Sequence, residues 1–331
     1  MEDQITVHLD RGWDLAQKGD AEGAAACAQR AHALNPNSAE VHNLMGFAAA
    51  LEGDADVALK HYRHAIALDD AYFEAMLNAA EVMIAPLSEF DAALVQIDEA
   101  LKLAETDEEV ADCILLKVDA LVSKGDYEGA KRAMKMLPDG PFDSPSYFFL
   151  IGRAWYELGQ LEKAVPFIEQ AVVADPTNAD AHYYLGLVRD EQGDLQAATE
   201  ALLRSRTLEL GHSPPTWSPS PDAFAAVVRG SVEKLDVLLG RYVRAAEIYV
   251  TDLPGAELVV DGVDPRAPLV LDTPPAEEGR PSRVRLFVYQ RNVERMAGSL
   301  ERLGGELLAA LEREVSAVFL DGQPPDKNHL N

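Results

Sequence analysis

Small and apolar residues recur at helical spacing along the first two thirds of the chain, and the pattern repeats every 34 residues. The repeated positions are Gly12, Gly19, Ala24 and Ala31, which return as Gly46, Gly53, Ala58 and Ala65, and Gly152, Gly159 and Ala164, which return as Gly186, Gly193 and Ala198. A fixed period of this length predicts stacked helix–turn–helix units. Such an array offers a surface for binding rather than a reaction centre.

Each kind of small residue has a physical role in this pattern. Alanine is expected where the two helices of a pair cross closely, because a larger side chain would push them apart. Glycine is expected at the end of each first helix, where a left-handed backbone costs little only for glycine. Pro36 and Pro176 are expected to end second helices, since proline restricts the residue before it.

Four stretches carry the full pattern and resemble the tetratricopeptide repeat, beginning VHLDRGWDLAQKGD, VHNLMGFAAALEGD, YFFLIGRAWYELGQ and AHYYLGLVRDEQGD. Two further units, 73–104 and 111–138, are degenerate. The first has PLSEFDAAL in place of the glycine turn, and the second has Val118 at the position of the first-helix glycine. The resemblance covers roughly residues 5–210 and implies an all-α superhelix of about six repeats, which we take as domain 1–210.

In this family the first helices line a concave groove, and its side chains sit at fixed offsets from the first-helix glycine. The resemblance therefore implies a partner-binding groove made by Trp13, Asn43, Phe47, Asn78, Glu81, Phe149, Arg153, Tyr156, Tyr183 and Tyr184. Trp13 and Phe149 have an alternative role as packing between repeats. Glu40 and Glu74 stand where a carboxylate clamp would need basic residues, so we expect a basic or amphipathic protein segment as partner.

Charge and composition narrow the partners further. The formal net charge is −27, and residues 1–210 contain 38 acidic against 16 basic residues. An acidic surface repels nucleic acid and anionic lipid. The start, MEDQITVHLDRGW, does not resemble a signal peptide, and no apolar run approaches the ~20 residues of a membrane span. We therefore expect no nucleic-acid binding, no membrane insertion and a cytoplasmic location, in a bacterial protein.

The metal-ligating residue types do not form a site in the sequence. Cys27 and Cys113 both lie in helical patterns of the array and are expected to be small buried apolar residues. His61 and His64 lie three apart on one helix, but without a third ligand nearby they are expected to be surface or packing residues. The sequence predicts no metal and no cofactor.

Residues 211–221, GHSPPTWSPSP, interrupt the helical pattern and are predicted to be a linker, with Trp217 anchored on a neighbouring surface. The domain that follows, 222–331, is predicted to be α+β. Its first part has apolar residues at helical spacing, and EIYVTDLP, ELVVDG, PLVLD and RVRLFVYQ are predicted as short strands. VERMAG and the last long segment return to a helical pattern.

This order of elements is similar to that of small bacterial zincin-like metallopeptidase domains, and RLFVYQRNVERM matches the lead-in to their active-site helix. That resemblance implies a helix bearing two zinc-binding histidines around a general-base glutamate. Here Arg313 and Ala317 stand at the histidine positions, and only Glu314 persists. Arginine stays protonated and cannot ligate a cation, and alanine has no ligand atom. We therefore expect a vestigial helix, no catalytic residue and a pseudo-enzyme.

Arg283, Arg285, Arg291 and Arg295 form a basic cluster. It has two possible roles, contact with an acidic partner or packing against the acidic array, and we favour the second. The leading hypothesis is a non-catalytic adaptor in a bacterial assembly for polarity, motility, secretion or signalling. The alternatives are a metallopeptidase with unusual ligands and a regulator or co-activator of a small GTPase.

Overall fold

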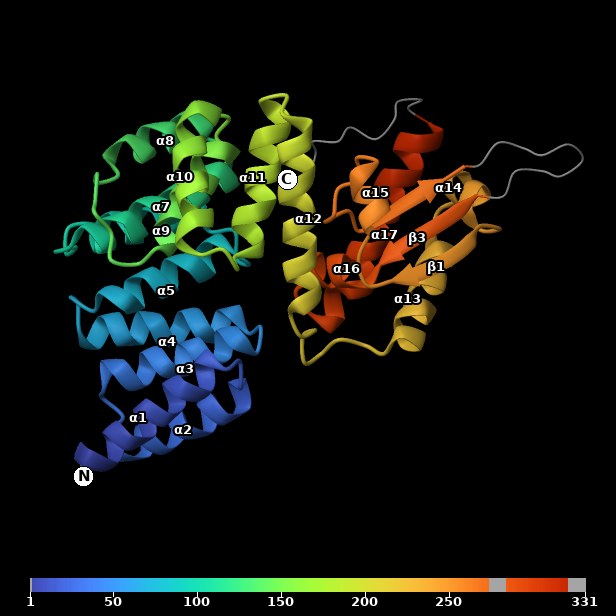
Figure 1. The fold of residues 1–331 in the computed structure, drawn as a ribbon. Coiled ribbons are helices and arrows are strands. Elements are labelled where there is room, and N and C mark those ends of the chain that lie inside the picture. The colour runs from blue at the N-terminus through green and yellow to red at the C-terminus, as the bar shows by residue number, and fades with distance from the viewer. Residues whose placement is uncertain (1, 274–283, 321–331) are drawn as a thin grey trace, which may run out of the picture. The chain divides into compact units, whose positions relative to one another are not determined.

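The computed structural model describes residues 2–273 and 284–320 (Figure 1). The chain packs as two compact units, 1–167 and 168–331. This division differs from the predicted boundary at residue 210. The reason is that the last helix pair of the array packs with the C-terminal region, as described below, and therefore belongs to the second unit.

The first unit consists of helices that follow one another as antiparallel pairs. Their bounds are α1 Glu2–Gln17, α2 Ala21–Leu34, α3 Ala39–Leu51, α4 Ala55–Leu68, α5 Phe73–Ile84, α6 Phe90–Ala100, α7 Asp107–Lys124, α8 Tyr127–Ala133 with a 3-10 turn at Met134–Met136, α9 Ser146–Glu157, and the start of α10, Leu161–Ala174. The predicted crossing positions Ala24, Ala58 and Ala164 are completely buried.

The Gly-Asp dipeptides of the repeat explain how each first helix ends and each second helix begins. Gly19 and Gly53 have φ of 75° and 83°, the left-handed conformation that the sequence predicts there. The side chains of the following Asp20 and Asp54 each accept a hydrogen bond from the backbone N–H three residues later. One residue therefore ends a helix and the next caps its successor.

The first degenerate repeat makes its turn without glycine. Between α5 and α6 the left-handed position is taken by Ser88, whose φ is 56°. Glu89 then precedes α6 without a side-chain cap. The helix pair still forms, because Ala93 and Ile97 of α6 are fully buried in the apolar core that α6 shares with α5. Loss of the glycine thus changed the turn and left the pair intact.

The second unit begins with the rest of α10 and the last repeat pair, followed by a mixed domain. Its elements are α11 Ala179–Glu191, α12 Leu195–Gly211, α13 Pro221–Lys234, α14 Val237–Val243, β1 Glu247–Thr251, α15 Ala256–Val260, β2 Leu269–Asp272, β3 Arg285–Tyr289, α16 Gln290–Ala297 and α17 Leu300–Phe319. Of the helices that the structure describes, none is long and apolar enough to cross a membrane.

The three strands form one sheet in the order β1-β3-β2, with β1 parallel and β2 antiparallel to the central β3. Leu286 and Val288 of β3 are fully buried in one core with Leu307 and Leu311 of α17. The predicted linker anchor Trp217 packs partly buried against this core. The mixed α and β content agrees with the sequence-based prediction.

One predicted strand is wrong. ELVVDG forms helix α15 instead, beginning after Gly255. In this short helix Val259 is buried while Val260 is 58% exposed, so only one side of the segment needs to be apolar. A short apolar run between turn residues fits either a strand or a helix, and the periodicity alone did not decide between them.

Candidate functional site: the repeat groove and the last repeat

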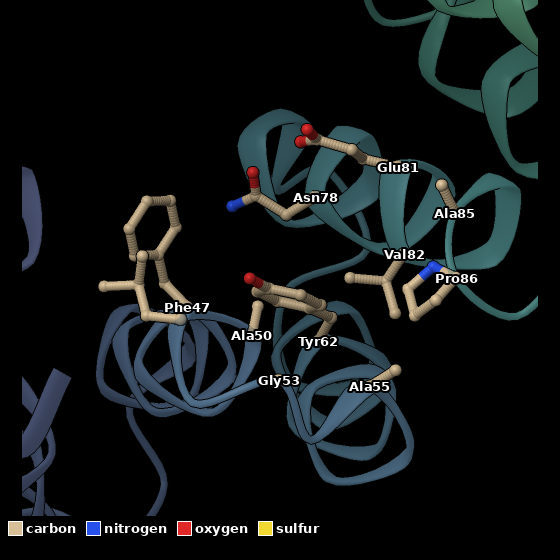
Figure 2. A pocket seen from close by; sticks show the side chains of 11 residues that line it. Phe47, Ala50, Gly53, Ala55, Tyr62, Asn78, Glu81, Val82, Ala85 and Pro86 are labelled. Carbon is tan, nitrogen blue, oxygen red and sulfur yellow. The ribbon is translucent and has the colours of Figure 1, made fainter. Parts of the chain in front are cut away.

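A pocket of about 290 Å³ lies between α3, α4 and α5 in the first unit (Figure 2). Its apolar walls come from Phe47, Tyr62, Val82 and Pro86, with smaller residues between them. The remaining lining residues are Ala50, Leu51, Gly53, Ala55, Asn78, Glu81 and Ala85. Three predicted groove residues, Phe47, Asn78 and Glu81, thus surround one cavity.

The pocket walls are held by close packing on both sides. Trp13 contacts Phe47 edge to face, with ring centroids 5.4 Å apart, so it supports the wall rather than lining the cavity. Tyr62 is 1% exposed and packs over Gly46, where a Cβ atom would lie only 2.6 Å from its ring. Burial raises the pKa of Tyr62 well above its usual range. Tyr62 lies on a second helix, which is why offsets from the first helix missed it.

Amides form a short hydrogen-bonded chain beside the pocket. Asn78 donates from Nδ2 to Asn43 Oδ1 over 3.0 Å, and Asn43 donates from Nδ2 to the Tyr72 hydroxyl over 3.3 Å. Asn43 is only 2% exposed, so almost none of its surface is available to a partner. Its role in the structure is to position Asn78, which lines the pocket on α5.

Together with Glu81, the first helices α7 and α9 form a group of three carboxylates and one guanidinium. Arg153 on α9 lies between Asp119 on α7, at 4.0 Å, and Glu157, at 3.6 Å. Burial raises the pKa of Asp119, the Arg153 charge opposes that rise, and Glu157 and Glu81 add to it. We call Glu81, Asp119, Glu157 and Arg153 the acidic cluster; the formal charges of these four side chains sum to about −2.

Tyr183 does not line an open groove. It is 6% exposed, its hydroxyl donates to Asp264 Oδ2 over 2.9 Å, and the guanidinium of Arg266 stacks 4.0 Å above its ring. Tyr184 contacts it edge to face, and Phe149 and Tyr156 on α9 are half-buried. The repeat pattern carries no information about the loop with Asp264 and Arg266, which contacts Tyr183 in the structure.

The predicted basic patch divides into separate roles. On α16, Arg295 pairs with Glu209 of α12, and Arg291 donates to the Glu209 carbonyl over 2.7 Å and to the His212 carbonyl over 2.9 Å. Arg285 instead pairs across the sheet with Asp272 at 2.5 Å. Arg283 lies outside the described residues. Two of the arginines therefore contact the acidic end of the array.

Arg266 completes this junction between the last repeat and the mixed domain. Its guanidinium pairs with Asp180 and, at 3.2 Å, with Glu209. Arg266 and Glu209 are only 13% and 14% exposed, and burial raises the pKa of the neighbouring Asp264. Charge pairs this buried are costly to break once formed, because the remaining partner is left unpaired.

The QRNVER motif holds three segments of this domain together through hydrogen bonds. Gln290 donates to Glu294 over 2.7 Å and to the Pro219 carbonyl over 2.9 Å, and Ser218 donates to Glu294 over 2.6 Å. Asn292 donates to the carbonyls of residues 265 and 267, each over 2.8 Å. The motif thus ties the linker and the Asp264–Arg266 loop to the sheet.

On α17, Arg313 is exposed, whereas Glu314 and Ala317 are partly buried. Burial raises the pKa of Glu314. Within residues 2–273 and 284–320, no group of three or more histidine, cysteine or carboxylate side chains is placed to hold a metal ion. Cys27 and Cys113 are both buried, as the sequence predicts.

Comparison with known proteins identifies the repeat class. Residues 152–203 match the family model for the TPR repeat. Pseudomonas aeruginosa PilF superposes with a TM-score of 0.53 at 16% identity, over 64% of this chain and 94% of PilF. PilW, a type IV pilus biogenesis factor, gives 0.53 at 17% identity, over 61% and 92%. Residues 152–203 are therefore similar to the TPR repeat, and the two solved structures share the fold of the helical array.

A second comparison, by sequence, matches a shorter segment of the chain. The probable biofilm formation methyltransferase WspC of Pseudomonas putida is 38% identical over 71 residues, which are 22% of this chain and 17% of WspC. The match spans less than a fifth of that protein.

Proposed function

We propose that this protein is a non-catalytic adaptor whose repeat groove binds a basic, amphipathic protein segment. The observation that carries the proposal is the position of Glu81, which borders the apolar pocket and also belongs to the acidic cluster on α5, α7 and α9. A segment with an apolar side chain and a lysine or arginine one helical turn away fits both parts at once.

The two parts of the groove contribute differently to binding. Burial of one large apolar side chain in the pocket is worth about 1.5–3 kcal/mol. A pairing with half-exposed carboxylates adds only ~0.2–1 kcal/mol and weakens with salt. The pocket therefore supplies affinity, and the acidic cluster supplies selection for charge and orientation.

Fluorescence anisotropy with labelled helical peptides tests this proposal. The probe peptide has Lys one turn after Phe, and its control has Glu in place of Lys. We expect binding of the Lys peptide by the full chain, weakened by Phe47→Ala and by Glu81→Lys, and unchanged by Glu22→Gln, since Glu22 is an exposed residue of α2 outside the pocket. Equal binding of both peptides, or full binding by Phe47→Ala, would refute the groove as the site.

The mixed domain is proposed to be an inactive relative of zincin-like peptidases that adds a second contact surface. The order β3, α16, α17 and the lone Glu314 support this relation, and Arg313 and Ala317 at the expected ligand positions argue against catalysis. Metal analysis of the purified protein separates this from a peptidase with unusual ligands. Stoichiometric zinc that is lost in Glu314→Ala would favour the peptidase.

The assembly that the adaptor serves is proposed from its structural relatives. PilW is a type IV pilus biogenesis factor, and WspC is linked by its name to biofilm formation. Both agree with a bacterial assembly in motility or surface behaviour. Affinity capture from the native host with the full chain, compared with Phe47→Ala, would identify the partner that depends on the groove.

A further inference from the structure

Four histidines from three helices meet where the first two repeats pack. His42 on α3 is central: its ring centroid lies 5.3 Å from His32 on α2, and 5.6 Å and 4.1 Å from His61 and His64 on α4. His42 is 6% exposed. The i, i+3 spacing of His61 and His64 was visible in the sequence, whereas the two histidines that complete the cluster come from other helices.

The hydrogen bonds of His42 define how protons are distributed. Its Nε2 lies 3.0 Å from the carbonyl of Pro36, which can only accept, so Nε2 carries a hydrogen. Its Nδ1 lies 3.3 Å from Nδ1 of His61. In neutral His42 this Nδ1 accepts the hydrogen of His61. If both rings were protonated, two N–H groups would point at each other, and the contact could not persist.

The surroundings of His42 and His61 also disfavour the protonated, charged form of both rings. Burial lowers the pKa of both His42 and His61. The neighbours that lower these pKa values further are His42 and Lys60 for His61, and His32 and His64 for both rings; each of these groups is a cation when it carries the proton. The only opposing contribution is the Pro36 carbonyl at His42. Protons are therefore taken up less readily in the folded protein than in the unfolded chain.

The cluster is built into the same helices as the pocket. His42 is followed on α3 by Asn43, which positions Asn78, and His61 is followed on α4 by Tyr62, which forms a pocket wall. A change in the distance between α3 and α4 therefore displaces both the histidine cluster and the pocket walls that these helices carry. Interior packing transmits such displacements because it leaves few voids.

We propose that the cluster of His32, His42, His61 and His64 makes the packing of the first two repeats, and with it the groove, sensitive to protons. Acidification charges His42 and His61 at the centre of the cluster, repels the helices that carry them from their neighbours and weakens partner binding. The groove part of this inference rests on the proposed function; the stability part does not.

The sign of the effect follows from linkage. A histidine whose pKa is lowered by folding contributes stability that is fully present above its unfolded pKa of about 6.5 and is lost as the pH falls below it. The full chain should therefore have a lower Tm at pH ~5.5 than at pH ~7.5. We expect a fall of at least ~2–4 °C in the transition of the first unit.

His182 offers a matched control. Its Nε2 lies 3.1 Å from the carbonyl of Pro176, six residues earlier, which is the same contact that His42 makes with Pro36. The test compares the Tm at the two pH values for wild type, His42→Gln/His61→Gln and His182→Gln. The double variant should lose most of the pH-dependent fall, and His182→Gln should keep it.

Two further measurements complete the test. If the double variant does not fold, the histidine C–H resonances of the wild-type chain are titrated by NMR, and at least two should titrate below the surface histidines. Uniform titration near the unperturbed value, or an equal fall in Tm for all variants, would overturn the proposal. So would stabilisation by one equivalent of Zn²⁺ that requires His42, because it would assign the cluster to a metal.

Peptide affinity then tests the link to the groove. The Lys-containing peptide should bind wild type more weakly at the lower pH, and the double variant should show a smaller change. Absence of the pH-dependent fall in Tm in the wild-type chain refutes the cluster itself. A retained Tm effect with no peptide binding at any pH refutes only the proposed function.

Discussion

Replacement of Gly46 by alanine tests the packing on which the pocket depends. An added Cβ would lie 2.6 Å and 2.7 Å from two ring carbons of Tyr62 and 3.1 Å from the carbonyl oxygen of Ala58. Tyr62 is fully buried and the carbonyl belongs to the backbone of α4, so neither can yield without moving the helix. The first-helix glycine is thus required by close approach.

The magnitude follows from two opposing effects. Alanine gains about 1 kcal/mol over glycine in a helix interior. Overpacking of a well-filled interior costs ~1–3 kcal/mol, and here the clash with backbone places it near the upper end. The net expectation is a destabilisation of about 1–2 kcal/mol. Because Tyr62 forms a pocket wall, peptide affinity should fall as well.

Gly230 on α13 is the matched control, because a Cβ there meets nothing within 4 Å. Gly230→Ala should stabilise its helix by up to ~1 kcal/mol. Urea unfolding followed by circular dichroism measures both variants against wild type. Gly46→Ala at least as stable as wild type would refute the reasoning on helix packing.

Three further changes have defined outcomes. Phe47→Ala should weaken binding of the Lys-containing peptide by roughly tenfold or more, as burial of one large side chain implies, while circular dichroism stays unchanged. Glu209→Gln should destabilise the second unit by about 3 kcal/mol, because Arg266 and Arg295 both lose the Glu209 charge, although Arg266 keeps Asp180; an unchanged urea midpoint would contradict the junction. Glu314→Gln should stabilise the second unit slightly at neutral pH, by less than about 1 kcal/mol. Burial raises the pKa of Glu314, so this gain should vanish as the pH falls through that pKa towards the unfolded value, which a pH series of Tm values checks.

The repeat fold was predictable because its determinants are local. Gly19 and Gly53 adopt the left-handed turns that a glycine before an N-cap aspartate predicts. Helix pairs also bury alanine at fixed places, so the period alone locates them. Even the unit that lacks its glycine keeps its helices, since Ser88 adopts the turn conformation.

The groove was predictable only in part. Offsets from the glycine located Phe47, Asn78 and Glu81, because each of these side chains lies on the first helix of its own repeat. They missed Tyr62, which enters the pocket from the second helix, and they placed Tyr183 in the open. Contacts between elements that are far apart in sequence, such as Tyr183 with Asp264, leave no periodic signal.

The histidine cluster shows the same limit. His61 and His64 share a helix and were visible as a pair, whereas His32 and His42 join them only through packing of three helices. Likewise the arginines of α16 were recognisable as a cluster, but their contact with Glu209 depends on how the mixed domain folds against α12. These contacts depend on how distant segments pack together, which the spacing of residues along the sequence does not reveal.

The most direct test of the groove is amide hydrogen exchange of the full chain with and without the Lys-containing peptide. We predict added protection in α3 and α5, around Phe47 and Glu81, and in α7 near Asp119. The same peptide with Glu in place of Lys should give none. Protection confined to the second unit, or equal protection by both peptides, would contradict the proposal that this groove selects a basic, amphipathic segment.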